Sequence, residues 1–179
     1  NPGDVKQCTI TNDDIAPTIT LNQNVINDYG GSAGPNDFGL TVGGAPVNSG
    51  VAIAVTANSA IEINEAGLAG YSFVDITGDA ACPTVLGGTV TLALAENLTC
   101  TITNDDVAPL LTVTKVVVND DGGTKVVADF PLFVDGNPVN SGDQNSFNAG
   151  SHTVSETADP GYGSEERRVG KECRSRWSP

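Results

Sequence analysis

Short runs of β-branched and apolar residues, separated by turns rich in Gly, Asn and Pro, make up most of this chain. Such runs are typical of β-strands. Across residues 16–107 they recur at the spacing of an all-β sandwich, which predicts seven strands. The predicted strands are residues 18–26, 37–42, 51–56, 60–65, 71–77, 89–95 and 98–104.

The chain repeats itself at an offset of 92 residues. The segment from Cys8 to Asp14 recurs letter for letter from Cys100 to Asp106, and residues 16–50 match residues 108–142 at 18 of 35 positions. A repeat of this length is far above the period of a solenoid and fits a self-contained sandwich domain of about 100 residues. The predicted fold class is therefore all-β, built from tandem β-sandwich repeats.

The repeat register predicts the domain organisation. Residues 1–15 are expected to be the last strand of a truncated upstream copy, residues 16–107 one complete copy, and residues 108–163 a truncated following copy. An Ala-Pro pair stands at each junction, where proline stiffens a short linker and blocks strand pairing across it.

Residues 164–179 differ in composition from everything before them: they hold all the arginines and the one tryptophan. The segment resembles the in-frame translation of a sequencing adapter, and we interpret it as a non-native tail; a natural basic tail is the alternative. Without it the formal charge of −14 becomes −16, because 19 acidic and 3 basic residues remain. So acidic a chain is expected to repel nucleic acid, and it has no apolar window long enough to span a membrane.

Cys82 and Cys100 lie in the complete copy and predict one disulfide. A domain of this size has a small core, and closing the 18-residue loop between the two cysteines should stabilise it by about 3 kcal/mol. A disulfide indicates an oxidising compartment. Cys8 corresponds to Cys100 of an upstream copy, and Cys173 lies in the tail. The alternative, a metal site, requires CxxC or Cys/His pairs that the sequence lacks.

Residues 147–162 (FNAGSHTVSETADPGY) resemble the Gly-x-Tyr-x-Val-x-Glu and Gly-Tyr signature of Cna-B-type, SpaA-like or prealbumin-like repeats of bacterial surface proteins and pilins. Residues 111–116 resemble the first strand of such repeats and residues 100–104 their last strand. The resemblance covers residues 1–163. It implies an immunoglobulin-like or transthyretin-like β-sandwich that serves as a stalk or adhesive module on a cell surface.

Some domains of this family form an isopeptide bond between a lysine and an asparagine, assisted by a buried acid. The resemblance places Lys115 and Glu156 at the lysine and acid positions of the third copy. In the complete copy, Glu65 and Asn104 stand at the acid and asparagine positions, but Gln23 replaces the lysine. Glutamine is not a nucleophile of this kind, so no bond is expected there. The favoured alternative is that both glutamates bond to the backbone and Lys115 is a solvated strand residue.

Clusters of carboxylates at the strand ends suggest a second kind of site. Asp13 and Asp14 end the first copy of the repeated strand, and Asp105 and Asp106 end the second. Such oxygen-rich loops suit Ca²⁺, which takes six to eight oxygen ligands. The alternative is a set of Asx-type turns that end each strand. No other cofactor is expected.

The sequence does not predict an enzyme. His152 is the only histidine, and its position on a strand face with Val154 predicts a packing role. The complete copy has no histidine, which excludes a Ser/His/Asp triad there. No pattern marks a cleft for glycoside hydrolysis.

We therefore expect a non-catalytic structural or adhesive repeat of a secreted or cell-surface bacterial protein, with an extracellular ligand or a host or matrix surface as its partner. The alternative is an accessory module, binding carbohydrate or Ca²⁺, of a larger secreted enzyme. Both hypotheses place the chain outside the cell or on its surface.

Overall fold

The computed structural model describes residues 2–163 in two compact units. The first comprises residues 2–26, 33–68 and 72–104, and the second comprises residues 27–32, 69–71 and 105–163. Nearly all regular structure is β-strand, which confirms the predicted fold class. Within the described residues no helix has the length and apolar character to cross a membrane. The predicted tail, residues 164–179, lies outside the described residues.

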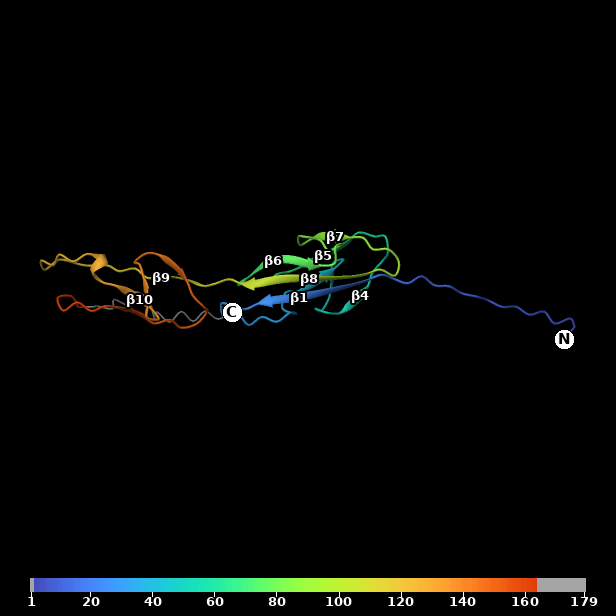
Figure 1. Cartoon of the computed structure of the whole chain (residues 1–179), viewed down its shortest axis with the longest axis horizontal. Coiled ribbons are helices and arrows are strands. Elements are labelled where there is room, and N and C mark those ends of the chain that lie inside the picture. The colour runs from blue at the N-terminus through green and yellow to red at the C-terminus, as the bar shows by residue number, and fades with distance from the viewer. Residues whose placement is uncertain (1, 164–179) are drawn as a thin grey trace. The chain divides into compact units, whose positions relative to one another are not determined.

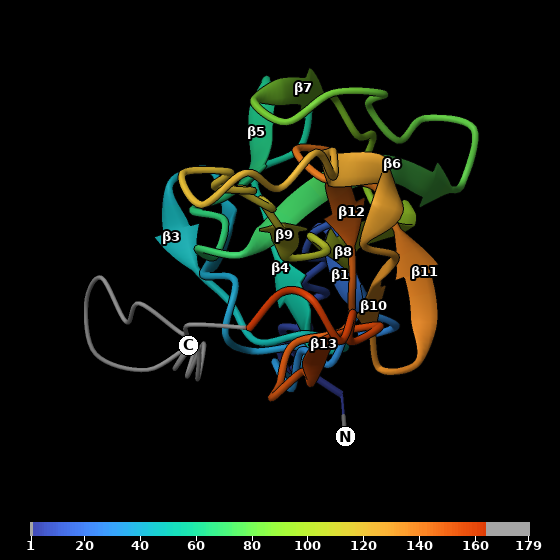
Figure 2. The same ribbon diagram turned by 90° about the vertical axis from the view of Figure 1, so that its left-hand side faces the viewer.

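Two four-stranded sheets form the sandwich of the complete repeat (Figure 1). One has the strand order β4-β1-β8-β6 and the other β3-β2-β5-β7. Two views agree that β5 and β7 lie in a different layer from β1, β4 and β8 (Figures 1 and 2). The strands are β1 Thr18–Ile26, β2 Leu40–Val42, β3 Ala45–Pro46, β4 Ala52–Ala54, β5 Ile61–Glu65, β6 Tyr71–Gly78, β7 Gly88–Val90 and β8 Asn97–Asp106.

The hydrophobic core lies between the two sheets because each strand turns alternate side chains inward. From one sheet, β1 and β8 supply side chains that are almost fully buried, and β2 and β5 supply their partners from the other sheet. The principal members are Ile19, Leu21, Cys100 and Ile102 on one side and Leu40, Val42, Ile61 and Ile63 on the other.

β8 lies in the middle of its sheet, between β1 and β6. The arrows of β1 and β8 point the same way in Figure 1, so this pair is parallel. At the start of both strands, Thr18 Oγ1 donates a hydrogen bond to Asn97 Oδ1 over 2.6 Å, and the Thr18 amide donates to Glu96 O over 2.9 Å. The first and last strands of the repeat are therefore neighbours.

The predicted disulfide is present between Cys82, in the loop before β7, and Cys100 in β8, with their Cα atoms 5.8 Å apart. Cys100 is fully buried, so the bond ties that loop to the core. Cys8 is a free, exposed thiol.

Several predicted strands are shorter than expected. β1 spans the predicted residues in full, but β2 begins at Leu40 rather than at residue 37, because Gly39 takes a left-handed conformation with φ 62°. β7 ends at Val90, and a turn at residues 94–95, with Ala95 at φ 63°, precedes β8. The two-residue strand β3 was not predicted, since so short an element has no periodicity to detect.

Residues 2–15 form no strand and are exposed throughout, although residues 8–14 repeat the sequence of the end of β8. A strand needs a neighbouring strand, and residues 2–15 belong to none of the sheets in the described part of the chain. The assignment of residues 1–15 to the last strand of an upstream copy stays a prediction.

The following repeat contains two smaller sheets, ordered β11-β10-β13 and β12-β9. The first corresponds to β3-β2-β5 and the second to β4-β1 at the repeat offset. A single 3₁₀-helical turn, η1 Val127–Asp129, lies between β9 and β10 in the chain. The strands are β9 Leu110–Thr112, β10 Leu132–Val134, β11 Asn137–Val139, β12 Gln144–Ser146 and β13 Val154–Glu156.

Replacing both Cys82 and Cys100 with alanine should lower the free energy of unfolding of the complete repeat by about 3 kcal/mol, because the unfolded chain gains loop entropy. Urea denaturation measures this loss. Cys8→Ala is the matched control and should leave the midpoint unchanged, since Cys8 is exposed and unpaired. Equal midpoints for the double variant and the control would show that the disulfide does not support the fold.

Candidate functional site

Three polar side chains stand among the inward-facing positions of the complete repeat: Gln23 on β1, Glu65 at the end of β5 and Asn104 on β8. Gln23 follows Ile19 and Leu21 inward because alternate residues of a strand share a face. Only 7% of Gln23 and 2% of Asn104 is exposed. Polar groups at this depth need hydrogen-bond partners or they destabilise the fold.

The side chains of Asn104 and Glu65 are hydrogen-bonded to each other. The Nδ2 of Asn104 donates to both carboxylate oxygens of Glu65, each over 2.9 Å. Burial raises the pKa of Glu65, and the hydrogen bond from Asn104 offsets part of that rise. The structure thus brings together the acid and the asparagine that the sequence assigns to the complete copy. A carboxyl group that holds its proton more readily is suited to polarise an amide.

Gln23 has no such partner. Neither its Nε2 nor its Oε1 takes part in a hydrogen bond among the described residues. An unsatisfied buried amide typically costs about 1–3 kcal/mol. Because an amide nitrogen shares its lone pair with the carbonyl, it cannot attack Asn104 as a lysine amine would. In the complete repeat, Glu65 and Asn104 therefore lie together, while Gln23 supplies no nucleophile.

Lys115 occupies the equivalent position in the following repeat. Its Nζ lies 2.5 Å from Glu156 Oε2 and 4.4 Å from the centre of the Phe130 ring. The backbone N–H of Lys115 donates to Ser141 Oγ over 2.9 Å, as that of Gln23 donates to Ser49 Oγ over the same distance. The backbone at Lys115 and the backbone at Gln23 therefore have matching hydrogen bonds, although only the lysine side chain has a polar partner.

These contacts correct the simpler expectation for the charged residues. The side chain of Lys115 is 18% exposed and that of Glu156 is 23% exposed, so the lysine is not a solvated strand residue. Glu65 and Glu156 each bond to a side chain, from Asn104 and Lys115 respectively. Whether Lys115 forms a covalent bond stays a proposal, because no asparagine is placed against it in the described part of the chain.

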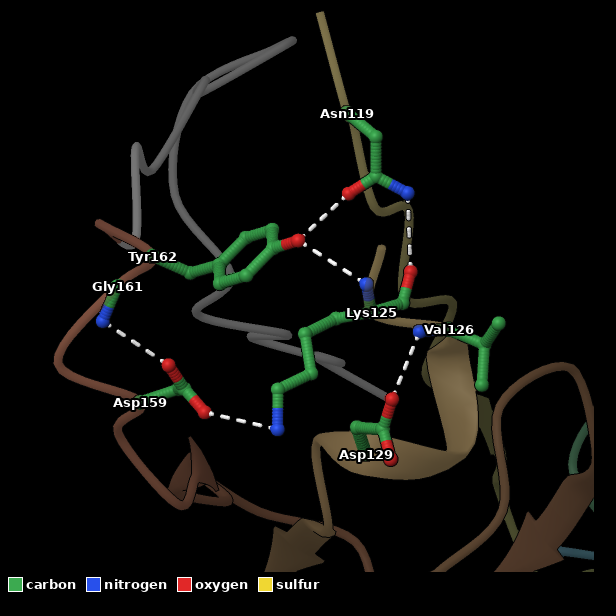
Figure 3. A network of polar contacts seen from close by, with 7 residues as sticks. All are labelled: Asn119, Lys125, Val126, Asp129, Asp159, Gly161 and Tyr162. Carbon is green, nitrogen blue, oxygen red and sulfur yellow. Dashed lines mark hydrogen bonds and ion pairs between the residues drawn. The ribbon is translucent and has the colours of Figure 1, made fainter. Parts of the chain in front are cut away.

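The Gly-Tyr pair of the family signature has a structural role in both repeats. The hydroxyl of Tyr71 donates to Asn27 Oδ1 over 2.5 Å, and that of Tyr162 donates to Asn119 Oδ1 over 2.7 Å. Figure 3 shows the second network, in which Tyr162 Oη also accepts the Lys125 N–H over 3.0 Å. The tyrosine thus closes the turn that follows the first strand of each repeat.

Glycine is required beside each tyrosine hydroxyl. A Cβ atom at Gly31 would overlap Tyr71 Oη, and one at Gly123 would overlap Tyr162 Oη. This close approach explains the second glycine of the Gly-Gly pair that both copies carry at this turn.

Three carboxylates gather at the same turn of the complete repeat. Asp28, Asp105 and Asp106 bring one oxygen each to within 4.8 Å of one another. Asp106 is buried and accepts hydrogen bonds from the backbone N–H groups of Tyr29 and Gly31, over distances of 2.6–3.1 Å. These bonds agree with the turn-forming role that was the alternative to a Ca²⁺ site. Asp28 was missed by the sequence reasoning, although the Asn-Asp pair repeated in both copies was an available signal.

The other two predicted metal ligands lie elsewhere. Asp13 and Asp14 belong to the exposed N-terminal segment, where the Asp14 N–H donates to Asp13 Oδ1 over 3.1 Å. Among the described residues they join no cluster of possible ligands.

The pKa values of Asp28 and Asp106 in the carboxylate cluster are shifted in opposite directions. Desolvation raises the pKa of Asp28, and the charges of Asp105 and Asp106 and a hydrogen bond to Asp106 raise it further. Desolvation also acts on Asp106, but hydrogen bonds from Tyr29, Gly31 and Asp28 hold its pKa below the ordinary value. Asp28 is therefore the member that takes up a proton as the pH falls, or whose charge a cation would offset.

His152 does not have the purely packing role that was predicted. Its Nδ1 lies 2.6 Å from Asp135 Oδ2 and its Nε2 lies 2.8 Å from Asn148 O, while its ring packs against Phe147. The hydrogen bond with Asp135 raises the pKa of His152 and lowers that of Asp135. The stability that protonated His152 contributes is present at low pH and is lost as the pH rises through its folded-state pKa.

A family model described as a prealbumin-like fold domain, of the SpaA type, matches residues 14–102 and 105–172. The matches cover most of the chain, and the chain belongs to this family. Domains of this type are typical of bacterial surface and pilus proteins and are generally non-catalytic structural modules. No curated protein and no solved structure gave a significant match.

Asp28→Asn should raise the thermal stability of the chain at neutral pH, because an uncharged amide removes repulsion within the cluster. The raised pKa means that ionised Asp28 destabilises the fold above its folded-state pKa and ceases to do so as the pH falls through it. The gain should therefore vanish below the ordinary aspartate pKa of about 4. Thermal unfolding from acid to neutral pH measures it, and a gain that persists in acid would contradict this assignment.

Proposed function

We propose that this chain is a non-catalytic stalk segment of a secreted or cell-surface bacterial protein, in which each repeat carries tension along the chain. Membership of a family typical of surface and pilus proteins supports this class. The disulfide supports an oxidising compartment outside the cytoplasm.

The observation that carries the proposal is the parallel pairing of β1 with β8. The chain enters the complete repeat at the start of β1 and leaves it at the end of β8, so these two points lie at opposite ends of one strand pair (Figure 1). Tension along the chain then slides the strands past each other, and every hydrogen bond between them resists at once. If the load instead entered at one end of the pair, the bonds would break one after another.

The polar positions suit the same role. Lys115 and Glu156 would supply the amine and the acid for a cross-link between the first and last strands. Such a covalent bond would bear the tension in place of the hydrogen bonds. Glu65 and Asn104 keep the matching half of the site in the complete repeat. We propose that repeats with lysine at this position are the covalently reinforced ones.

The accessory-module alternative rests on the carboxylate cluster of Asp28, Asp105 and Asp106. If the cluster holds Ca²⁺, adding CaCl₂ should raise the thermal stability of the natural sequence and leave Asp28→Asn unchanged. An equal response of both proteins would argue against a calcium role and leave the stalk proposal standing.

Pulling the chain in two geometries tests the stalk role. With handles at the two ends of the complete repeat, single-molecule force spectroscopy should show unfolding at several times the force needed when the second handle is attached at Asn97→Cys. The reason is that Asn97 begins β8 and lies beside the start of β1, so this geometry opens the strand pair from one end. Similar forces in both geometries would contradict the proposal.

Gln23→Lys should restore cross-linking in the complete repeat. Attack of the Lys amine on Asn104 Cγ forms the amide and releases ammonia, so the intact mass should fall by about 17 Da below the calculated value and stay there after reduction. Gln23→Met is the control of similar length without an amine, and Glu65→Gln in the lysine background should block the reaction. An unchanged mass for Gln23→Lys would show that the three positions do not form a cross-link site.

A further inference from the structure

β6 is the outermost strand of its sheet in the complete repeat. The order β4-β1-β8-β6 gives it β8 as its one neighbour among the described residues. β6 is eight residues long, whereas the other edge strands of this sandwich, β3, β4 and β7, have two or three residues each. An edge of this length offers a row of backbone N–H and C=O groups to which a further strand can bind.

The residues of β6 lack the features that commonly protect an edge. Natural edge strands are often blunted by lysine, by proline or by a charge that points inward. The segment from Ser72 to Gly78 (SFVDITG) has no lysine and no proline, and its one charged residue, Asp75, is exposed. Six of these seven residues are exposed, and only Ile76 is buried. The long edge of the sandwich is therefore accessible from solvent.

The two faces of this edge differ in character. Because alternate residues of a strand share a face, Val74 lies on the inward face with the buried Ile76, yet it is 50% exposed. Phe73 and Asp75 lie on the outward face. A strand placed beside β6 would cover Val74 with one set of its side chains and meet Asp75 with the other. The edge therefore favours a partner whose apolar and polar side chains alternate.

The charge of the repeat determines the sign of those polar side chains. Residues 16–107 contain nine acidic residues and no Lys, Arg or His, so their formal charge is −9. Asp75 lies within the edge, and the exposed Asp79 follows its last residue. Opposite charges that face each other across two strands are favourable, and like charges are unfavourable. A second copy of the repeat would add a further −9 to the contact, whereas a basic segment would be attracted.

We propose that β6 is a docking site for an extended, basic polypeptide segment, which adds a strand to the sheet beside residues 72–78. The segment has apolar side chains at alternate positions and lysine or arginine between them. Backbone hydrogen bonds supply the affinity, and contacts with Val74 and Asp75 supply the preference for sequence. This goes beyond the stalk role, because it gives the repeat a partner of defined chemistry.

Docking at β6 is compatible with tension along the chain. The pair that bears the load in the proposed stalk is β1 with β8, and β6 lies on the other side of β8 from β1. A strand added to β6 leaves that pair in place, together with the contact between Asn104 and Glu65. Binding of the segment and resistance to force therefore use different strand pairs, and each can be measured without the other.

Peptide binding to the full chain tests the proposal. Every sample carries Cys8→Ala and Cys173→Ala, so that no disulfide links two molecules. The probe is a peptide of about nine residues, the length of an ordinary strand, which alternates valine with threonine and has lysine at two of the threonine positions. One control has glutamate in place of lysine, and the other is a scrambled peptide of the same composition without alternation.

Isothermal titration calorimetry should show the lysine peptide binding at least about tenfold more tightly than either control. Absence of binding would overturn the proposal. Equal binding of the scrambled peptide would overturn it too, because it would indicate attraction by net charge alone.

Reversing the charge of the edge should reverse the preference. Asp75→Lys should weaken binding of the lysine peptide about tenfold and strengthen binding of the glutamate peptide, because the pair across the two strands changes sign. Glu62→Lys is the matched control, since it makes the same change of net charge at an exposed position of β5, in the other sheet. It should leave the preference for the lysine peptide unchanged. Equal losses from the two variants would contradict the assigned edge.

Hydrogen exchange locates the docked strand. Amides within residues 72–78 should exchange more slowly when the lysine peptide is present, because the added strand supplies hydrogen-bond partners. Protection confined to another strand would overturn the assignment to β6. Protection of the same amides at high protein concentration without peptide would identify a second copy as the occupant, and the choice of a basic partner would then be wrong.

Discussion

The parallel pairing of β1 with β8 is the contact on which the rest of the complete repeat depends. β8 lies between β1 and β6, and one strand supplies four separate functions. Cys100 anchors the disulfide, Ile102 fills the core, Asn104 binds the buried Glu65, and Asp106 holds the turn after β1. Since these roles lie on alternate residues of one inward face, losing the register of this strand would lose all of them together.

In the following repeat, the described residues include no counterpart of β8 beside β9. Its first strand keeps hydrogen bonds to β12 but is regular over three residues only, and its inward side chains stay partly exposed. The identical segment at residues 8–14 forms no strand at all. Strand formation here is thus decided by the presence of a partner more than by local preference. A parallel pair joins distant parts of the chain, so no local turn can stand in for it.

Features set by local pattern were predictable, and features set by distant partners were not. Alternation of apolar and polar residues predicted β1 residue by residue, and the repeat register predicted which cysteines pair. The family resemblance implied that Glu65 and Asn104 share a site, and they are hydrogen-bonded. The setting of Lys115 was missed because its burial depends on Phe130 and Glu156, which the chain brings together only through the sheets. Asp28 escaped notice for the same reason, since its neighbours lie at the far end of the repeat.

The distance along the chain between β1 and β8 also bears on how the repeat reaches its native state. During synthesis β1 is made first and β8 last, so β1 cannot pair with β8 until nearly the whole repeat is complete. Such long-range pairing is slow. During that interval the open edge of β1 is available to the last strand of the preceding copy, whose sequence at residues 8–14 is the same as that of residues 100–106 in β8. A protein built from such repeats therefore faces a competition between correct pairing and pairing with the wrong copy, and the order in which strands emerge decides the outcome.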